Sequence, residues 1–235
     1  YGFHIGATNT NLGMINEYLS GGLGSEFGGI KVFMGSSTGN MLVSDEEALR
    51  KFFMIKDKPI LIHSEDEAVI KANLMAAEAE FGDDIPFSEH PRIRSRKACI
   101  RSTAKALEMA IEYGTRLHVL HVSTAEEVEM IRAAKLHNPR ITAETSANYL
   151  WFCDEDYDRL KGRVKCNPAV KGAADREALR KGLAEGVIDT IGSDHAPHLL
   201  SEKEAPYLRC PSGLPSIQQS LAVVLTAADL SLIHI

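Results

Sequence analysis

Short apolar runs and longer amphipathic stretches alternate along the whole of this chain. Apolar runs of four to six residues between polar positions are typical of strands buried in a parallel sheet. Such runs occur at residues 3–6, 30–34, 59–63, 117–122, 141–144 and 190–193. Helical stretches separate most of them, so the sequence predicts a repeated strand–helix order.

Several predicted helices begin at a hydroxyl residue that is followed three positions later by glutamate. This is the spacing of a capping box, in which each side chain bonds to the other residue's backbone N–H. The pairs are Ser44 with Glu47, Ser64 with Glu67, and Thr124 with Glu127. A further amphipathic helix is predicted over residues 175–185, closed by Gly186, where a left-handed conformation costs least.

Repeated strand–helix units form either a doubly wound sheet or a closed (β/α)8 barrel. Nearly every predicted strand here ends in a residue type that binds metals, and only a barrel directs so many strand ends at one central point. The sequence therefore predicts an α/β fold of the TIM-barrel type. Residues 35–39 (GSSTG) resemble a phosphate-binding loop only loosely, so we expect no nucleotide site.

Composition and charge narrow the class of partner. Of the 235 residues, 44% are hydrophobic and 25% are charged, as in an ordinary globular domain, and we expect one domain over residues 1–229. The formal net charge of −6 gives no reason to expect nucleic acid or an anionic membrane. No run is long and apolar enough to cross a bilayer. We therefore expect a small-molecule substrate.

The cysteines and the two ends of the chain add three expectations. The four cysteines are widely spaced and form no CxxC pair, which favours reduced thiols in the cytoplasm. The chain begins at Tyr1 inside a predicted strand, so we expect the natural protein to extend upstream. Residues 230–235 (LSLIHI) complete no element and are expected to be a non-native tail. The sequence leaves a homo-oligomer open.

Two residues stand where barrel enzymes place functional groups. Lys31 lies within the apolar run 29–34 (GIKVFM), where burial of an ammonium group is costly. Either its side chain extends past the strand to water, or it is carbamylated and its new carboxylate bridges two divalent metal ions. His63 ends the strand 59–63, at a strand-to-helix corner. It is either a ligand or a structural histidine.

Two further segments carry imidazoles. His118 and His121 share one predicted strand, and side chains three positions apart on a strand point to opposite faces. We predict that His121 is the ligand and that His118 packs outward against a helix. Residues 193–198 (SDHAPH) place a carboxylate and two imidazoles after the last strand, where the carboxylate can bind a metal and transfer a proton. The alternative is an aspartate helix cap in a solvated turn.

Five segments together resemble dihydroorotases of the amidohydrolase superfamily, in the same order. They are residues 29–34 (GIKVFM), 62–65 (IHSE), 120–124 (LHVST), 167–168 (NP) and 193–198 (SDHAPH). The last segment is the most specific and favours dihydroorotases over allantoinases and hydantoinases. The resemblance covers residues 1–229 and implies a metal-dependent hydrolase barrel of which about strands 3 to 8 are present.

The resemblance implies two Zn²⁺ ions in the active site of the complete enzyme. It assigns Lys31 as the carbamylated lysine that bridges them, and His63 and His121 as ligands of the second ion. Asp194 would bind the first ion and also carry the proton. These roles require four side chains from distant parts of the chain to converge on one pocket.

Substrate contacts are implied for Asn167 and His198, and for the backbone near Ser212 and Gly213. The chain also departs from the family. The opening His-x-His-x-Arg motif, which supplies two ligands of the first ion and an arginine for the substrate carboxylate, has no counterpart, and His4 does not replace it. Four further positions differ from residues common in relatives: Asn148, Tyr149, Ser216 and Gln218.

The implied activity is the reversible interconversion of carbamoyl aspartate and dihydroorotate in pyrimidine biosynthesis. Two alternatives stay open: an allantoinase or dihydropyrimidinase-like hydrolase, and an inactive dihydroorotase-like protein with a structural role. The absent motif favours the inactive protein, whereas the retention of four costly polar side chains argues against it. From these 235 residues alone we expect little activity, because two ligands of the first ion are missing.

Overall fold

A sheet of parallel strands forms the centre of this computed structural model, which describes residues 2–22, 26–35 and 41–233. Within these residues six strands pair in the order of the sequence, and every pair is parallel. They are β1 (Phe3–Gly6), β2 (Phe27–Phe33), β3 (Ile60–His63), β4 (Leu117–Val119), β5 (Thr142–Ser146) and β6 (Thr190–Gly192). A doubly wound sheet would reverse its strand order, so this order confirms a curled, partial barrel.

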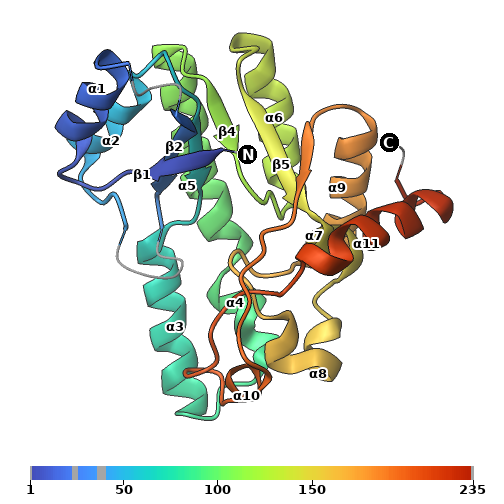
Figure 1. Ribbon diagram of the computed structural model, residues 1–235. Coiled ribbons are helices and arrows are strands. Elements are labelled where there is room, and N and C mark those ends of the chain that lie inside the picture. Colours follow the sequence, from blue (N-terminus) through green and yellow to red (C-terminus); the bar gives the residue numbers. More distant parts are fainter. Residues whose placement is uncertain (1, 23–25, 36–40, 234–235) are drawn as a thin grey trace.

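Helices connect the strands and cover the outer face of the sheet (Figure 1). α5, α6 and α9 pack side by side there. The helices are α1 (Leu12–Ser20), α2 (Glu46–Phe53), α3 (Glu67–Phe81), α4 (His90–Ile93), α5 (Arg96–Tyr113), α6 (Ala125–His137), α7 (Ala147–Trp151), α8 (Asp156–Leu160), α9 (Ala173–Ala184), α10 (Leu200–Lys203) and α11 (Ile217–Asp229), with the 3₁₀ turns η2 (Phe87–Glu89) and η3 (Lys161–Val164).

The main core lies between the sheet and these helices. Alternate residues of the central strands are completely buried in it, because successive side chains of a strand point to opposite faces. These residues are Ile30, Val32, Ile60, Ile62, Leu117 and Val119. The opposite, concave face is left to the remaining strand residues, which include the polar candidates for function.

The predicted strands all form, with ends shifted by up to three residues, whereas the helix caps are partly different. Thr124 caps α6 as predicted. The prediction is wrong for α2 and α3, whose capping residues lie one and two positions beyond Ser44 and Ser64: Asp45 and Asp66 accept the capping hydrogen bonds. Aspartate caps a helix as well as serine does, so the tertiary structure chooses between neighbours.

Three smaller expectations can be compared with the described residues. Gly186, after α9, has a φ of 70°, as predicted. Residues 36–39 of the loose phosphate-loop resemblance lie outside the described part of the chain, as do residues 234–235 of the expected tail, whose non-native origin stays a prediction. Among the helices that the structure describes, none combines the length and apolarity needed to cross a membrane.

Candidate active site

The concave face of the sheet carries polar side chains at positions set by the strand register. The register runs from Lys31 of β2 through Leu61 of β3 and His118 of β4 to Thr142 of β5. Residues that are paired across parallel strands point to the same face. Lys31 and His118 therefore lie in one row on the face opposite the helices.

The prediction that His118 packs outward against a helix is wrong. Its Nδ1 lies 2.8 Å from Oγ1 of Thr142, and its Nε2 lies 3.7 Å from a carboxylate oxygen of Glu144. The prediction assumed a strand that continues through His121, but β4 ends at Val119 and His121 has a φ of 39°. This change of backbone direction allows both histidines to face the concave side.

Lys31 is held inside the site rather than extended to bulk water. Its Nζ lies 4.7 Å from the centre of the Phe33 ring. Burial lowers the pKa of the Lys31 ammonium to about 8, although the nearby carboxylates of Asp194 and Glu144 offset part of the effect. A substantial fraction of the side chain is therefore a neutral amine in mildly alkaline solution, which is the form that can act as a nucleophile.

His63 and His121 meet at the ends of β3 and β4. Nδ1 of His63 lies 3.1 Å from Nε2 of His121, and both side chains are buried. Burial lowers the pKa of both imidazoles. The Glu65 carboxylate offsets part of this effect at His63, and the nearby Lys31 ammonium lowers the pKa of both rings further. Both rings are therefore neutral at pH 7, which is the form in which histidine binds metal ions.

Glu65 fixes the orientation of His63. Its Oε2 accepts a hydrogen bond from Nε2 of His63 at 3.0 Å and also pairs with the guanidinium group of Arg94. Burial raises the pKa of Glu65, but Arg94 and His63 outweigh burial and lower the pKa to about 2. An ionised acceptor places the imidazole proton on Nε2 and leaves the lone pair of Nδ1 directed at His121. The sequence prediction gave Glu65 no role, although its position two residues after His63 was a signal.

Asp194 follows β6 at the same end of the sheet. Its φ of 45° is a left-handed conformation that costs a non-glycine residue about 1–3 kcal/mol and is common at functional sites. Burial raises the pKa of its carboxyl group, and the Lys31 ammonium offsets part of that rise. A raised pKa suits a group that accepts and releases a proton.

The structure thus brings Lys31, His63, His121 and Asp194 together on the concave face. Two nitrogen ligands of one tetrahedral zinc ion lie about 3.3–3.4 Å apart when each is about 2.0–2.1 Å from the metal, and the histidine nitrogens come within a few tenths of an ångström of this spacing. Within the described ranges, no three His, Cys, Asp or Glu side chains could hold a metal ion by themselves. Metal binding by this cluster therefore stays a prediction.

The residues implied as substrate contacts lie on adjoining segments next to this cluster. Nε2 of His198 donates a hydrogen bond to the carbonyl of Ser212 at 3.2 Å. Gly213 has a φ of 141°, and a Cβ there would come within 2.6 Å of the carbonyl oxygen of Ala196. Oδ1 of Asn167 is buried without a hydrogen-bond partner in the described structure. A ligand can use such an acceptor, because buried polar atoms are normally paired.

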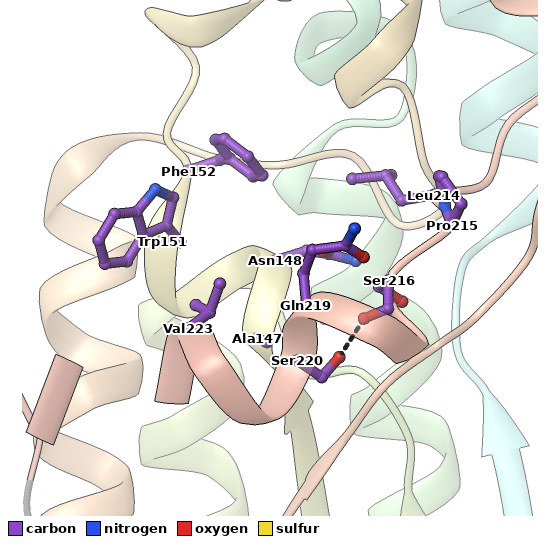
Figure 2. A pocket seen from close by; sticks show the side chains of 10 residues that line it. All are labelled: Ala147, Asn148, Trp151, Phe152, Leu214, Pro215, Ser216, Gln219, Ser220 and Val223. Carbon is purple, nitrogen blue, oxygen red and sulfur yellow. Dashed lines mark hydrogen bonds between the residues drawn. The ribbon is translucent and has the colours of Figure 1, made fainter. Parts of the chain in front are cut away.

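A cavity of about 290 Å³ lies between α7 and the start of α11 (Figure 2). Its lining is mostly apolar, with Trp151 and Phe152 from the α7 side and Val223 from α11. Asn148 and Ser216, two positions that the family resemblance singled out as unusual, also line it. Neither position is among the candidate ligands.

Comparison with known proteins gives consistent relatives, although no protein-family model matches the chain. The chain is 33% identical over 205 residues to the dihydroorotase of Methanosarcina acetivorans, an alignment that covers 84% of this chain and 43% of that protein. It is 37% identical over 167 residues to the dihydroorotase of Enterococcus faecalis, and this alignment covers 71% of this chain and 38% of that protein.

Solved structures agree with this result. The L-hydantoinase (dihydropyrimidinase) from Arthrobacter aurescens superposes on the chain with a TM-score of 0.91 at 26% identity, covering 100% of this chain and 52% of that one. The chain belongs to the dihydroorotase-like cyclic amidohydrolases. This dihydroorotase-like chain spans less than half the length of the two curated relatives. The structural match confirms the predicted barrel type.

Proposed function

We propose that this dihydroorotase-like chain carries the bridging lysine, the histidine pair and the proton carrier of a hydrolase that opens a cyclic amide. The proposed ring is dihydroorotate, formed from carbamoyl aspartate in the reverse direction. Lys31, His63, His121 and Asp194 come from four different strand regions. The observation that supports the proposal is that these four side chains lie on the same face of the sheet. The names of the relatives favour this substrate.

The proposed cofactor is a pair of Zn²⁺ ions. A carbamylated Lys31 would bridge them, His63 and His121 would bind one ion, and Asp194 would bind the other. Bound metal would supply a nucleophile at neutral pH and polarise the amide carbonyl. The lowered pKa of Lys31 supports its carbamylation, because only the neutral amine attacks carbon dioxide.

The side chains of the chain would perform the proton transfer and the binding. The Asp194 carboxylate would accept a proton from the attacking water and pass it to the ring nitrogen as the C–N bond breaks. Asn167, His198 and the backbone at Ser212 and Gly213 would hold the ring. Glu65 would keep the imidazole of His63 in the tautomer that presents Nδ1.

The proposed setting follows the same evidence. The partner would be a small molecule, without nucleic acid or membrane, and the protein would act in the cytoplasm. All four cysteines are free and buried, which agrees with a reducing compartment. The proposal allows for a homo-oligomer.

The substrate is tested by comparing three rings. With zinc added, kcat/KM for dihydroorotate is expected to exceed that for allantoin and dihydrouracil by about tenfold or more, and a chelator should remove the activity. Absolute rates from the 235 residues are expected to be low, so calorimetry should measure the binding of each ring in parallel. Preference for another ring would favour the related hydrolases, and metal binding without binding or turnover of any ring would favour the inactive alternative.

Carbamylation of Lys31 gives a separate prediction. Protein equilibrated with ¹³C-bicarbonate is expected to show a carbamate signal by ¹³C NMR, stronger at about pH 8.5 than at about pH 6.5, because the neutral amine increases as the pH rises through about 8. The amine and carbon dioxide form the carbamate and release one proton. The signal should persist in Lys181→Met, which changes an exposed lysine, and vanish in Lys31→Met. A signal that survives Lys31→Met would assign the carbamate elsewhere.

A further inference from the structure

Lys203 is a buried lysine at the end of α10, outside the metal-ligand cluster. Its Nζ donates hydrogen bonds to three backbone carbonyl oxygens: Lys165 at 3.0 Å, Pro211 at 2.8 Å and Gly213 at 2.9 Å. An ammonium group has three donors. All donors of Lys203 are therefore used within the protein, and its charge has no donor left for a ligand.

The three carbonyls belong to two segments that carry implied substrate contacts. Lys165 lies two residues before Asn167, and Pro211 and Gly213 flank Ser212. The backbone N–H of Gly213 also donates to the carbonyl of Lys165 at 2.9 Å. The Lys203 ammonium therefore joins the segment that presents Asn167 to the segment that presents Ser212.

The loop after β6 is held against the same two segments. The N–H of Ala196 donates to the carbonyl of Leu214 at 3.0 Å, and Nε2 of His198 donates to the carbonyl of Ser212. The approach is so close that Gly213 leaves no space for a Cβ against Ala196. A small shift of the segment around Gly213 would therefore displace the loop that carries His198 as well.

A second buried ammonium group acts on the neighbouring turn. Nζ of Lys165 donates to the carbonyls of Tyr207 and Cys210, both at 2.7 Å, and lies 4.0 Å from the centre of the Tyr207 ring. Lys165 itself lies on the Asn167 segment, so its side chain ties that segment to the turn that precedes Ser212. Lys203 differs in that it reaches the backbone of both segments from a third element, α10.

We propose that Lys203 is a positioning residue, which sets the relative places of Asn167, Ser212 and Gly213 and so shapes the pocket for the substrate ring. Carbonyl oxygens that converge on one point repel one another and, once buried, are costly without a donor. The Lys203 ammonium reduces the repulsion between the three carbonyl oxygens and gives each of them a hydrogen-bond donor. The identity of the ring rests on the proposed function, whereas the alignment of the segments does not.

The test compares Lys203→Met, Lys203→Arg and the matched control Lys181→Met, an exposed lysine on α9. Two quantities are measured: amide hydrogen exchange at Gly213 and Ala196, and the dissociation constant for dihydroorotate by calorimetry with zinc present. Lys203→Met is expected to speed exchange at both amides by about tenfold or more and to weaken binding by a similar factor, while exchange in β2 and β3 stays the same. Lys203→Arg should recover part of both losses, because its planar guanidinium can donate to some of the carbonyls. Lys181→Met should change neither quantity.

The two measurements separate failure of this inference from failure of the proposed function. Unchanged exchange in Lys203→Met would overturn the inference, and so would faster exchange with an unaltered dissociation constant. If Lys203→Met does not fold, Lys203→Arg decides: faster exchange and weaker binding than in the unaltered chain support the role, and values equal to it overturn the role. If the unaltered chain binds no dihydroorotate, the proposed substrate is wrong, and the exchange rates alone decide whether Lys203 aligns the segments.

Discussion

Asp194→Asn in the full-length enzyme is expected to lower kcat for ring opening by about 10²–10⁴-fold, because the amide cannot accept the proton that the reaction must move. The side chain keeps its shape and one carbonyl oxygen, so bound zinc per chain, measured by elemental analysis, should change little. Burial raises the pKa of the Asp194 carboxyl group. Activity that depends on the Asp194 carboxylate should accordingly fall as the pH drops through this raised pKa, and this limb of the pH profile should be absent from any residual activity of Asp194→Asn.

The matched control is Asp158→Asn, which makes the same chemical change at an exposed position on α8. It should leave both kcat and zinc content unchanged. Full activity in Asp194→Asn would refute the proton-transfer role. Loss of zinc in proportion to the loss of activity would instead make Asp194 chiefly a ligand.

Glu65→Gln is expected to lower the free energy of unfolding by about 3–5 kcal/mol, because it removes the carboxylate that pairs with buried Arg94. Urea unfolding at neutral pH measures the change, with Glu78→Gln on the exposed side of α3 as the control. The same variant should weaken zinc binding by about 10–100-fold, because the imidazole of His63 loses its ionised acceptor. Retention of full stability and zinc affinity would show that Glu65 does not orient His63.

Two further measurements sharpen this prediction. In the double variant Glu65→Gln with Arg94→Met, part of the lost stability should return, since no guanidinium is left without its carboxylate. The pKa of Glu65 is lowered from 4.5 to about 2 on folding, so its contribution to stability is present above pH 4.5 and is lost as the pH falls towards 2. Glu65→Gln should flatten the unfolding free energy over that pH range.

Most of the fold and the candidate ligands could be predicted because they depend on local patterns. A strand such as residues 59–63 shows itself as an apolar run, and a polar residue at its end, such as His63, is found by its place in that run. Parallel strands in sequence order bring their ends to one edge, so Lys31, His63, His121 and Asp194 converge without any detail of packing.

The face occupied by His118 could not be predicted, because alternation holds only while the strand continues. β4 ends at Val119, and the left-handed backbone at His121 reverses the expected side. The residue types near His121 do not indicate that the strand ends there. A positive φ at a histidine is uncommon, and here the packing around it imposes it.

The sequence by itself determined the order of strands and helices, the metal-binding residue types at strand ends and the family. Only the tertiary structure decided which charged groups pair with these residues and with the segments around them. Arg94 reaches Glu65 across 29 positions, and Lys203 reaches the carbonyl of Lys165 across 38. The physical reason is that a buried charged group must be paired, and the residue that pairs with it can lie anywhere in the sequence. Local patterns contain no information about contacts between such distant positions.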